Sequence, residues 1–120
     1  MNHIYIAGPY RAETSWAVEQ NIRRAEEIGF LVACAEAVPV IPHTMYRHFD
    51  GTLTDEYWLK ATQSLLRRCD GIVLLPGWAL SEGSCGEREL ANRLGLPMLD
   101  LASVPEEQRL KELRIFAEGR

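Results

Sequence analysis

The stretch GIVLLPGWALSEGSCGERELANRLG, residues 71–95, joins a predicted strand, a glycine-rich loop and a predicted helix in immediate succession. The apolar run GIVLLPG (71–77) is typical of a strand that is buried on both faces, because it does not alternate with polar residues. The part that follows, GSCGERELANRLG (83–95), has the periodicity of a helix. Four of its residues share one helix face: Glu87, Leu90, Ala91 and Leu94. A carboxylate therefore heads an otherwise apolar face.

This segment suggests two alternative roles for Glu87. Ser84 precedes Glu87 by three residues, which is the spacing of a capping box, in which the two side chains satisfy backbone N–H groups at the start of a helix. Alternatively, Glu87 is a catalytic or ligand-binding carboxylate. The segment alone leaves both explanations open.

The rest of the chain predicts an alternation of strands and helices. Three further apolar runs predict strands: HIYIAG (3–8), VPVIP (38–42) and LPMLDL (96–101). Three further helices are predicted from apolar residues at helical spacing: 15–37, 54–69 and 103–119. Their expected caps are Thr14 or Ser15, Thr54, and the pair Ser103 and Glu106. We expect Gly29 to weaken the first of these helices and Gly95 to end the helix over 83–95.

This alternation predicts the α/β class. Strands that are apolar on both faces indicate a parallel sheet with helices on both sides, connected by right-handed crossovers. We expect one domain over residues 1–120, with a doubly wound, flavodoxin-like or Rossmann-like sheet in strand order 2-1-3-4. In this order a crevice opens at the carboxyl ends of strands 1 and 3, where ligands bind.

Two loops are expected to border this crevice, AGPYRA (7–12) and PGWALSEGSCGE (76–87), and the second leads into the helix that carries Glu87. Small residues and Pro9 in these loops allow backbone to approach a ligand: Gly8, Pro9, Gly77, Gly83 and Gly86. Ser81 and Ser84 are candidates for holding a phosphate, unless they serve only turns and caps. Tyr10 and Trp78 are candidates for stacking on a flat ring, unless they are simply core residues.

A carboxylate in such a crevice suits attack on the anomeric carbon of a sugar, since the transition state resembles an oxocarbenium ion. Asp70 is not expected to act beside Glu87, because it lies at the start of the strand over 71–77 and so at the opposite edge of the sheet. We therefore interpret Asp70 as structural.

Composition excludes several classes of function. The 120 residues carry a net charge of −4 and no long basic run, which argues against binding to duplex nucleic acid. No apolar run reaches the roughly 20 residues of a membrane span, and the first residues lack a signal-peptide pattern, so a cytoplasmic location is expected. Cys34, Cys69 and Cys85 form neither an even set nor a C-x-x-C pair, although Cys85 lies where a thiol can become reactive. His43 and His48 lack the companion residues of a metal site, so no metal is expected.

Three motifs in this order resemble the nucleoside 2-deoxyribosyltransferase superfamily: IYIAGPYR (4–11), CDGIVLLPGW (69–78) and S-x-G-x-x-x-E at Ser81, Gly83 and Glu87. The pattern is similar to that of the 2′-deoxynucleoside 5′-phosphate N-hydrolases and of a small uncharacterised branch of DUF4406 type. The resemblance implies that Glu87 is the nucleophile and that Ser81 binds a 5′-phosphate. It also implies that Gly8, Tyr10 and Arg11 line the sugar and phosphate pocket, that no cofactor is used, and that the protein forms a homodimer or larger assembly. The helix over 54–69 is a candidate interface, although Tyr57 and Trp58 on it are equally suited to a core.

The chain departs from the superfamily at Thr62, where the active families have an aspartate that assists proton transfer and sugar positioning. Asp55, His43 and Tyr46 are alternative sources of a general acid. The leading hypothesis is an enzyme that cleaves or exchanges the N-glycosidic bond of a nucleoside or its 5′-monophosphate. The alternative is a non-catalytic nucleotide-binding module, which Thr62 favours. A third possibility is a structural α/β domain in which Glu87 only caps its helix.

Overall fold

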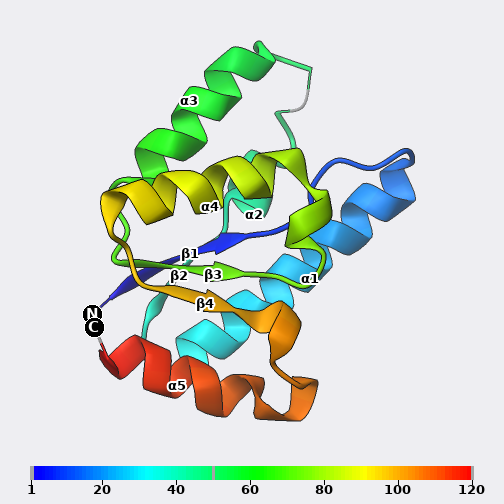
Figure 1. The fold of residues 1–120 in the computed structure, drawn as a ribbon. Helices are drawn as coiled ribbons and strands as arrows, with labels where there is room; N and C mark the ends of the chain where they lie inside the picture. Colours follow the sequence, from blue (N-terminus) through cyan, green and yellow to red (C-terminus); the bar gives the residue numbers. More distant parts are fainter. Residues whose placement is uncertain (1, 50, 120) are drawn as a thin grey trace.

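Four parallel strands form the single sheet of the computed structural model, which describes residues 2–49 and 51–119. The strand order is β2-β1-β3-β4, as the sequence predicts (Figure 1). The strands are β1 (His3–Ala7), β2 (Val38–Val40), β3 (Gly71–Leu74) and β4 (Met98–Asp100). In the register of the sheet, Tyr5 pairs with Val40 on one side and with Ile72 on the other. β1 and β3 are therefore the central strands.

Helices cover both faces of the sheet (Figure 1). They are α1 (Ser15–Cys34), α2 (Pro42–Tyr46), α3 (Asp55–Leu66), α4 (Glu82–Leu94) and α5 (Arg109–Gly119). Three 3₁₀ turns supplement them: Trp78–Leu80, Leu101–Ser103 and Glu106–Gln108. α1 and α5 lie on one face, α4 lies on the other, and α3 packs against α4 at the top of the view (Figure 1). The predicted class, α/β with a doubly wound parallel sheet, is confirmed.

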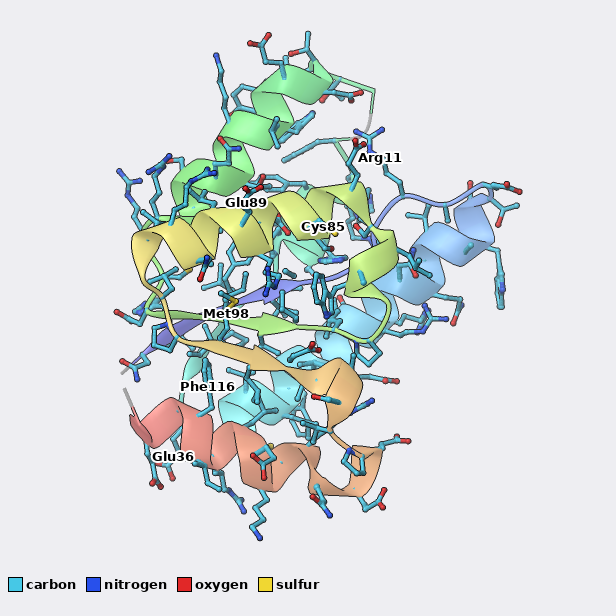
Figure 2. All side chains as sticks on the ribbon, in the orientation of Figure 1. Arg11, Glu36, Cys85, Glu89, Met98 and Phe116 are labelled. Carbon is cyan, nitrogen blue, oxygen red and sulfur yellow. The ribbon has the colours of Figure 1, made fainter. Side chains whose placement is uncertain are left out.

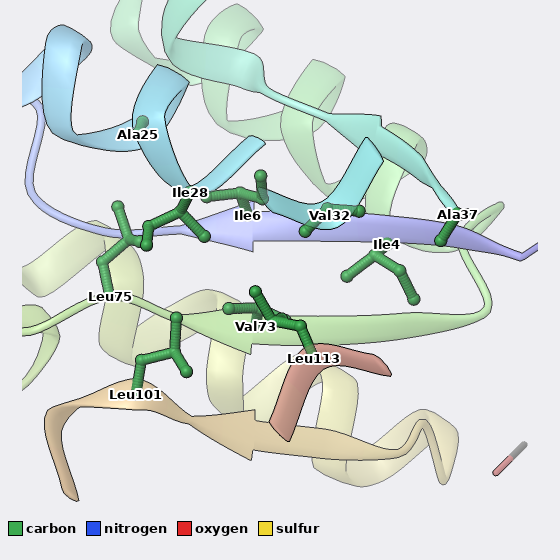
Figure 3. Packing of buried hydrophobic residues seen from close by; sticks show 10 residues of the cluster. All are labelled: Ile4, Ile6, Ala25, Ile28, Val32, Ala37, Val73, Leu75, Leu101 and Leu113. Atoms are coloured by element: carbon green, nitrogen blue, oxygen red, sulfur yellow. The ribbon is translucent and has the colours of Figure 1, made fainter. Parts of the chain in front are cut away.

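Alternation along the strands divides the core into two clusters. Ile4 and Ile6 of β1 point toward α1 and α5, where they pack with Val73 and Leu113 (Figure 3). Tyr5 and Ala7 point to the opposite face and pack under α4. Because β1 is paired on both sides, each of its side chains is removed from water by a helix layer. Tyr5 is the one side chain in this run with a hydroxyl, and that hydroxyl lies on the α4 face.

Several predicted ends of helices are confirmed. The Thr14 hydroxyl accepts from the Ala17 N–H at the start of α1, and the Thr54 hydroxyl accepts from the Tyr57 N–H at the start of α3. Gly95 ends α4 in the left-handed conformation, with φ of 73°.

Three other predictions about the helices are wrong. Ser81, not Ser84, caps α4: its hydroxyl accepts from the Ser84 N–H at 3.2 Å, because its extended backbone turns the side chain toward the first turn. Glu87 is therefore in the second turn, and a capping box with Ser84 is excluded. α5 begins only at Arg109, since the Ser103 hydroxyl donates to the Asp100 carbonyl instead of capping a helix. The first helix ends at Cys34 rather than at residue 37, and Glu36 follows with φ of 66°.

One helix was not predicted and one glycine has an additional role. The short α2 follows β2 directly, and Pro42 occupies its first position, where a missing N–H costs nothing. Gly29 is buried in α1, and a Cβ there would lie 2.4 Å from Ile41 Cδ1, so the glycine lets Ile41 pack against the helix.

Among the described residues, no helix is long and apolar enough to cross a membrane.

Candidate active site

A hydrogen bond between Tyr5 and Glu87 lies between β1 and α4. The Tyr5 hydroxyl donates to Glu87 Oε2 at 2.5 Å. Tyr5 is fully buried and Glu87 is partly buried. Glu87 comes from the second turn of α4 and is not turned toward bulk water, because its helix face is directed at the sheet. The pair therefore joins residues that are 82 positions apart at the centre of the fold.

The surroundings of this pair change the acidity of both groups. Burial raises the pKa of Glu87 from 4.5 to about 7, and the hydrogen bond from Tyr5 opposes this rise only in part. Burial, followed by the charge of Glu87, raises the pKa of Tyr5 well above its usual value of 10. The tyrosine therefore keeps its proton, while the carboxyl group is close to half ionised at neutral pH. A carboxyl group with this pKa in a partly buried position is typical of catalytic sites.

Two hydroxyl groups lie near the pair. Thr62 of α3 is a hydrogen-bond neighbour of the Tyr5 hydroxyl, and its Oγ1 also donates to the Leu59 carbonyl at 3.0 Å. Ser84 lies one turn before Glu87 on the same face of α4, and its buried hydroxyl has no partner among the described residues. A buried polar atom without a partner is unusual, because its hydrogen-bonding capacity is left unsatisfied.

The other carboxylates considered from the sequence are engaged elsewhere. Asp70 accepts from the His3 N–H at 2.8 Å and lies 3.6 Å from the imidazole of His3, at the amino edge of the sheet. This agrees with its predicted structural role. Asp55 pairs with Arg11 at 3.0 Å, and both side chains are exposed. Arg11 thereby links the first loop to the start of α3 (Figure 2).

His43 forms hydrogen bonds to the backbone of the first loop. The Nε2 atom of His43 lies 3.1 Å from the carbonyl oxygens of both Gly8 and Pro9, so this nitrogen carries the proton and donates to them. Burial lowers the pKa of His43, which keeps the ring neutral at pH 7. Gly8 is packed so closely that a Cβ would lie 2.5 Å from Leu75 Cδ1. His43 therefore supports the loop through these hydrogen bonds. The rings of His43 and Tyr10 also pack edge to face, with their centres 5.8 Å apart.

The second loop turns at Gly77, whose φ of 90° favours glycine. Trp78 follows, with its Nε1 donating to Asp100 at 3.1 Å. The guanidinium of Arg88 lies 5.5 Å from the centre of the Trp78 ring, so one face of this ring already has a cationic neighbour. Gly83 and Gly86 have open space where a side chain would be, and Cys85 is exposed beside them (Figure 2).

One prediction about the crevice is wrong. A cleft of about 460 Å³ does lie at the carboxyl ends of β1 and β3, where Pro9 and Gly77 line it. Glu87, however, is not one of its lining residues. The cleft is on the α1 side of the sheet, whereas α4 directs Glu87 onto Tyr5 on the opposite side. The sheet therefore lies between the cleft and the carboxylate.

Tyr5 is a site residue that was not predicted from the sequence. The available signal was its position: a tyrosine in a central strand whose neighbours Ile4 and Ile6 face the other way. A buried tyrosine normally needs a partner for its hydroxyl, and the partner had to come from the helix packed on that face. Glu87 was the carboxylate predicted on that helix face.

The fold and the buried pair define the class of this protein, a doubly wound α/β domain with a candidate catalytic carboxylate at its centre. The chain belongs to the family described as Domain of unknown function (DUF7768), whose model matches residues 2–100. The match includes Tyr5, Thr62 and Glu87. A search of curated proteins found no match to the sequence.

Proposed function

We propose that this protein cleaves or exchanges the N-glycosidic bond of a nucleoside or deoxynucleoside, or of its 5′-monophosphate, with Glu87 as the nucleophile. The observation that carries the proposal is the partly buried Glu87, hydrogen-bonded to Tyr5 and with its pKa raised to about 7. A helix-capping role does not account for such a carboxylate. Burying it is unfavourable, and it caps no helix. The resemblance of the three motifs to the nucleoside 2-deoxyribosyltransferase superfamily supports the choice of substrate.

The reaction proceeds in two displacements. A Glu87 oxygen attacks C1′ of the sugar, the bond from C1′ to the base nitrogen breaks, and its electron pair leaves with the base, which takes a proton from water. Water or a second base then attacks C1′ of the glycosyl ester and releases Glu87. Tyr5 holds Oε2, so we assign the attack to the other oxygen, Oε1. These steps use no metal or cofactor, since the carboxylate supplies the electron pair.

The start of α4 suits the phosphate of a nucleoside monophosphate. The Ser81 hydroxyl accepts from the Ser84 N–H and can still donate its own proton to a phosphate oxygen. The positive end of the helix dipole and the open backbone at Gly83 favour an anion at the same place. Tyr10, Arg11 and Trp78 are proposed to contact the sugar, phosphate and base.

The direct test is to measure, by chromatography, the free base that the protein releases from a panel of nucleosides and their 5′-monophosphates. Glu87→Gln is expected to abolish release, because an amide cannot form the glycosyl ester. Glu89→Gln is the matched control: Glu89 lies on the same helix but is exposed and pairs with Arg93. Base release that survives in Glu87→Gln would contradict the proposal.

The alternative function is a nucleotide-binding module without turnover. Thr62 favours it, because this position lies beside Tyr5 but carries no carboxylic acid to protonate the leaving base. Binding without release of base would support this alternative. The binding is measured as a ligand-dependent rise in melting temperature, which follows RT ln(1 + [L]/Kd).

We also propose a homodimer or larger homo-oligomer, in the cytoplasm. α3 and the segment before it expose large apolar side chains that are about half accessible: Phe49, Leu53, Tyr57 and Leu59. Trp58 packs with Tyr46 beneath this surface, with ring centres 4.9 Å apart. Leu59→Lys is expected to shift the mass measured by light scattering toward that of the monomer. The same mass for both proteins, whether monomeric or oligomeric, contradicts assembly through this surface.

A further inference from the structure

The cleft on the α1 side of the sheet has no role in the proposed reaction. It has a volume of about 460 Å³, within the range of small-molecule sites. It is lined by residues of α1 and by residues of the two loops that follow β1 and β3. Arg109, at the start of α5, lines it as well. The cleft thus lies across the sheet from Glu87.

The charge of the cleft is predominantly positive. Arg24 and Arg109 line it together with a single acidic residue, Glu27. Within residues 2–49 and 51–119, no ion pair involves either arginine. In addition, Arg109 Nε is buried and has no hydrogen-bond partner in this part of the chain. A guanidinium nitrogen that is removed from water without an acceptor is unfavourable, and a bound anion would relieve it.

We infer that this cleft binds a small phosphorylated molecule, with the phosphate held by Arg24 and Arg109. Two guanidinium groups present the planar sets of donors that match phosphate oxygens. The volume exceeds that of a phosphate ion, and the side chains of Ile28 and Leu75 give the remainder of the cleft an apolar wall. A phosphomonoester with an uncharged body therefore fits better than a bare anion.

Hydrogen bonds connect this cleft to the first loop of the candidate active site. Arg24 Nη1 donates to Asn21 Oδ1 at 2.8 Å, and Asn21 Nδ2 donates to the carbonyl oxygen of Tyr10 at 3.1 Å. On the other side, Gly77 lines the cleft immediately before Trp78 and the start of α4. A ligand on Arg24 would thus be connected by hydrogen bonds to the first loop, and Gly77 of the second loop lines the same cleft.

The experiment is a titration of ¹⁵N-labelled protein with inorganic phosphate, a hexose phosphate and a nucleoside monophosphate, each followed by amide chemical shifts. The unphosphorylated hexose and nucleoside are the controls. We expect saturable shifts at Asn21, Gly77 and Arg109 with phosphorylated probes only. Shifts confined to the region of Gly83 and Glu87 would assign the phosphate to the candidate active site and overturn the inference. An absence of saturable shifts at millimolar probe would also overturn it.

Variants distinguish the cleft from the candidate active site. The double variant Arg24→Gln/Arg109→Gln is expected to weaken the binding at least about tenfold, because each charged hydrogen bond is lost. Arg114→Gln, an exposed position on the same helix as Arg109, is the matched control and should leave the affinity unchanged. The spectra report directly whether each variant is folded, and Arg24→Lys/Arg109→Lys, which keeps both charges, should bind with intermediate affinity. Equal affinity in the double variant and the control contradicts the site.

Discussion

Replacing Tyr5 with phenylalanine tests the assignment of Glu87 through its acidity. The substitution removes the one hydroxyl that donates to Glu87 Oε2, at 2.5 Å, and keeps the ring that fills the core under α4. In the native protein two effects oppose each other at Glu87: burial raises its pKa, and the bond from Tyr5 lowers it. Without the bond, burial acts alone. The pKa of Glu87 must therefore rise above its native value of about 7.

The size of this rise follows from the strength of the lost bond. A hydrogen bond to a charged group contributes about 1.5–3 kcal/mol, and one pH unit corresponds to about 1.4 kcal/mol, so the rise is about one to two pH units. Since only the ionised carboxylate is a nucleophile, the proposed enzyme gains activity as the pH rises through this pKa. The acid limb of kcat/KM should therefore move to higher pH in Tyr5→Phe.

The assay is the rate of base release at low substrate concentration, measured on both sides of neutrality. Tyr57→Phe, at an exposed position on α3, is the control and should keep the native profile. The pKa of Glu87 is also measured directly from its carboxyl ¹³C shift, which needs no substrate. A profile and a carboxyl shift that do not move in Tyr5→Phe, or that move to lower pH, would refute this reasoning.

Three other substitutions have defined outcomes. Glu87→Gln should stabilise the protein above about pH 7 by about 1–3 kcal/mol. Because the pKa of Glu87 is raised from 4.5 to about 7 by folding, the native protein loses stability as the pH rises from 4.5, and the loss is complete above about 7. Urea unfolding at two pH values measures this difference, and an equal effect at pH 4 and pH 8 contradicts it. Gly8→Ala should destabilise by about 1–3 kcal/mol, because its Cβ would lie 2.5 Å from Leu75 Cδ1, and thermal unfolding should show a lower melting temperature. Thr62→Asp should increase base release about 10²-fold or more by placing an acid beside Tyr5; no increase would mean that this position does not serve the leaving base.

The fold was largely predictable because its determinants are local. Apolar runs without alternation indicated buried parallel strands, and threonines at positions 14 and 54 indicated where α1 and α3 begin. The errors came from competing local hydrogen bonds. Ser81 and Ser84 are equally good caps by residue type, and only the extended backbone at Ser81 decides between them. Ser103 was expected to cap α5 but bonds to the Asp100 carbonyl instead.

The candidate site was less predictable because it depends on packing between distant elements. The sequence identified Glu87 from its helix face, but its partner Tyr5 is 82 residues away and became evident only when α4 was placed on β1. Likewise, His43 was a candidate for proton transfer, yet its ring supports the carbonyls of Gly8 and Pro9. The side of the sheet on which the cleft opens depends on how α1 and α5 pack, and no short motif encodes it.

Trapping the covalent intermediate directly tests whether Glu87 is the nucleophile. The protein is mixed with a deoxynucleoside 5′-monophosphate from which it releases base, quenched rapidly in acid, digested and analysed by mass spectrometry. We expect an added deoxyribose phosphate on the peptide that contains Glu87, and no such modified peptide from Glu87→Gln. Base release accompanied by an adduct on another residue, or release that persists in Glu87→Gln, would contradict it.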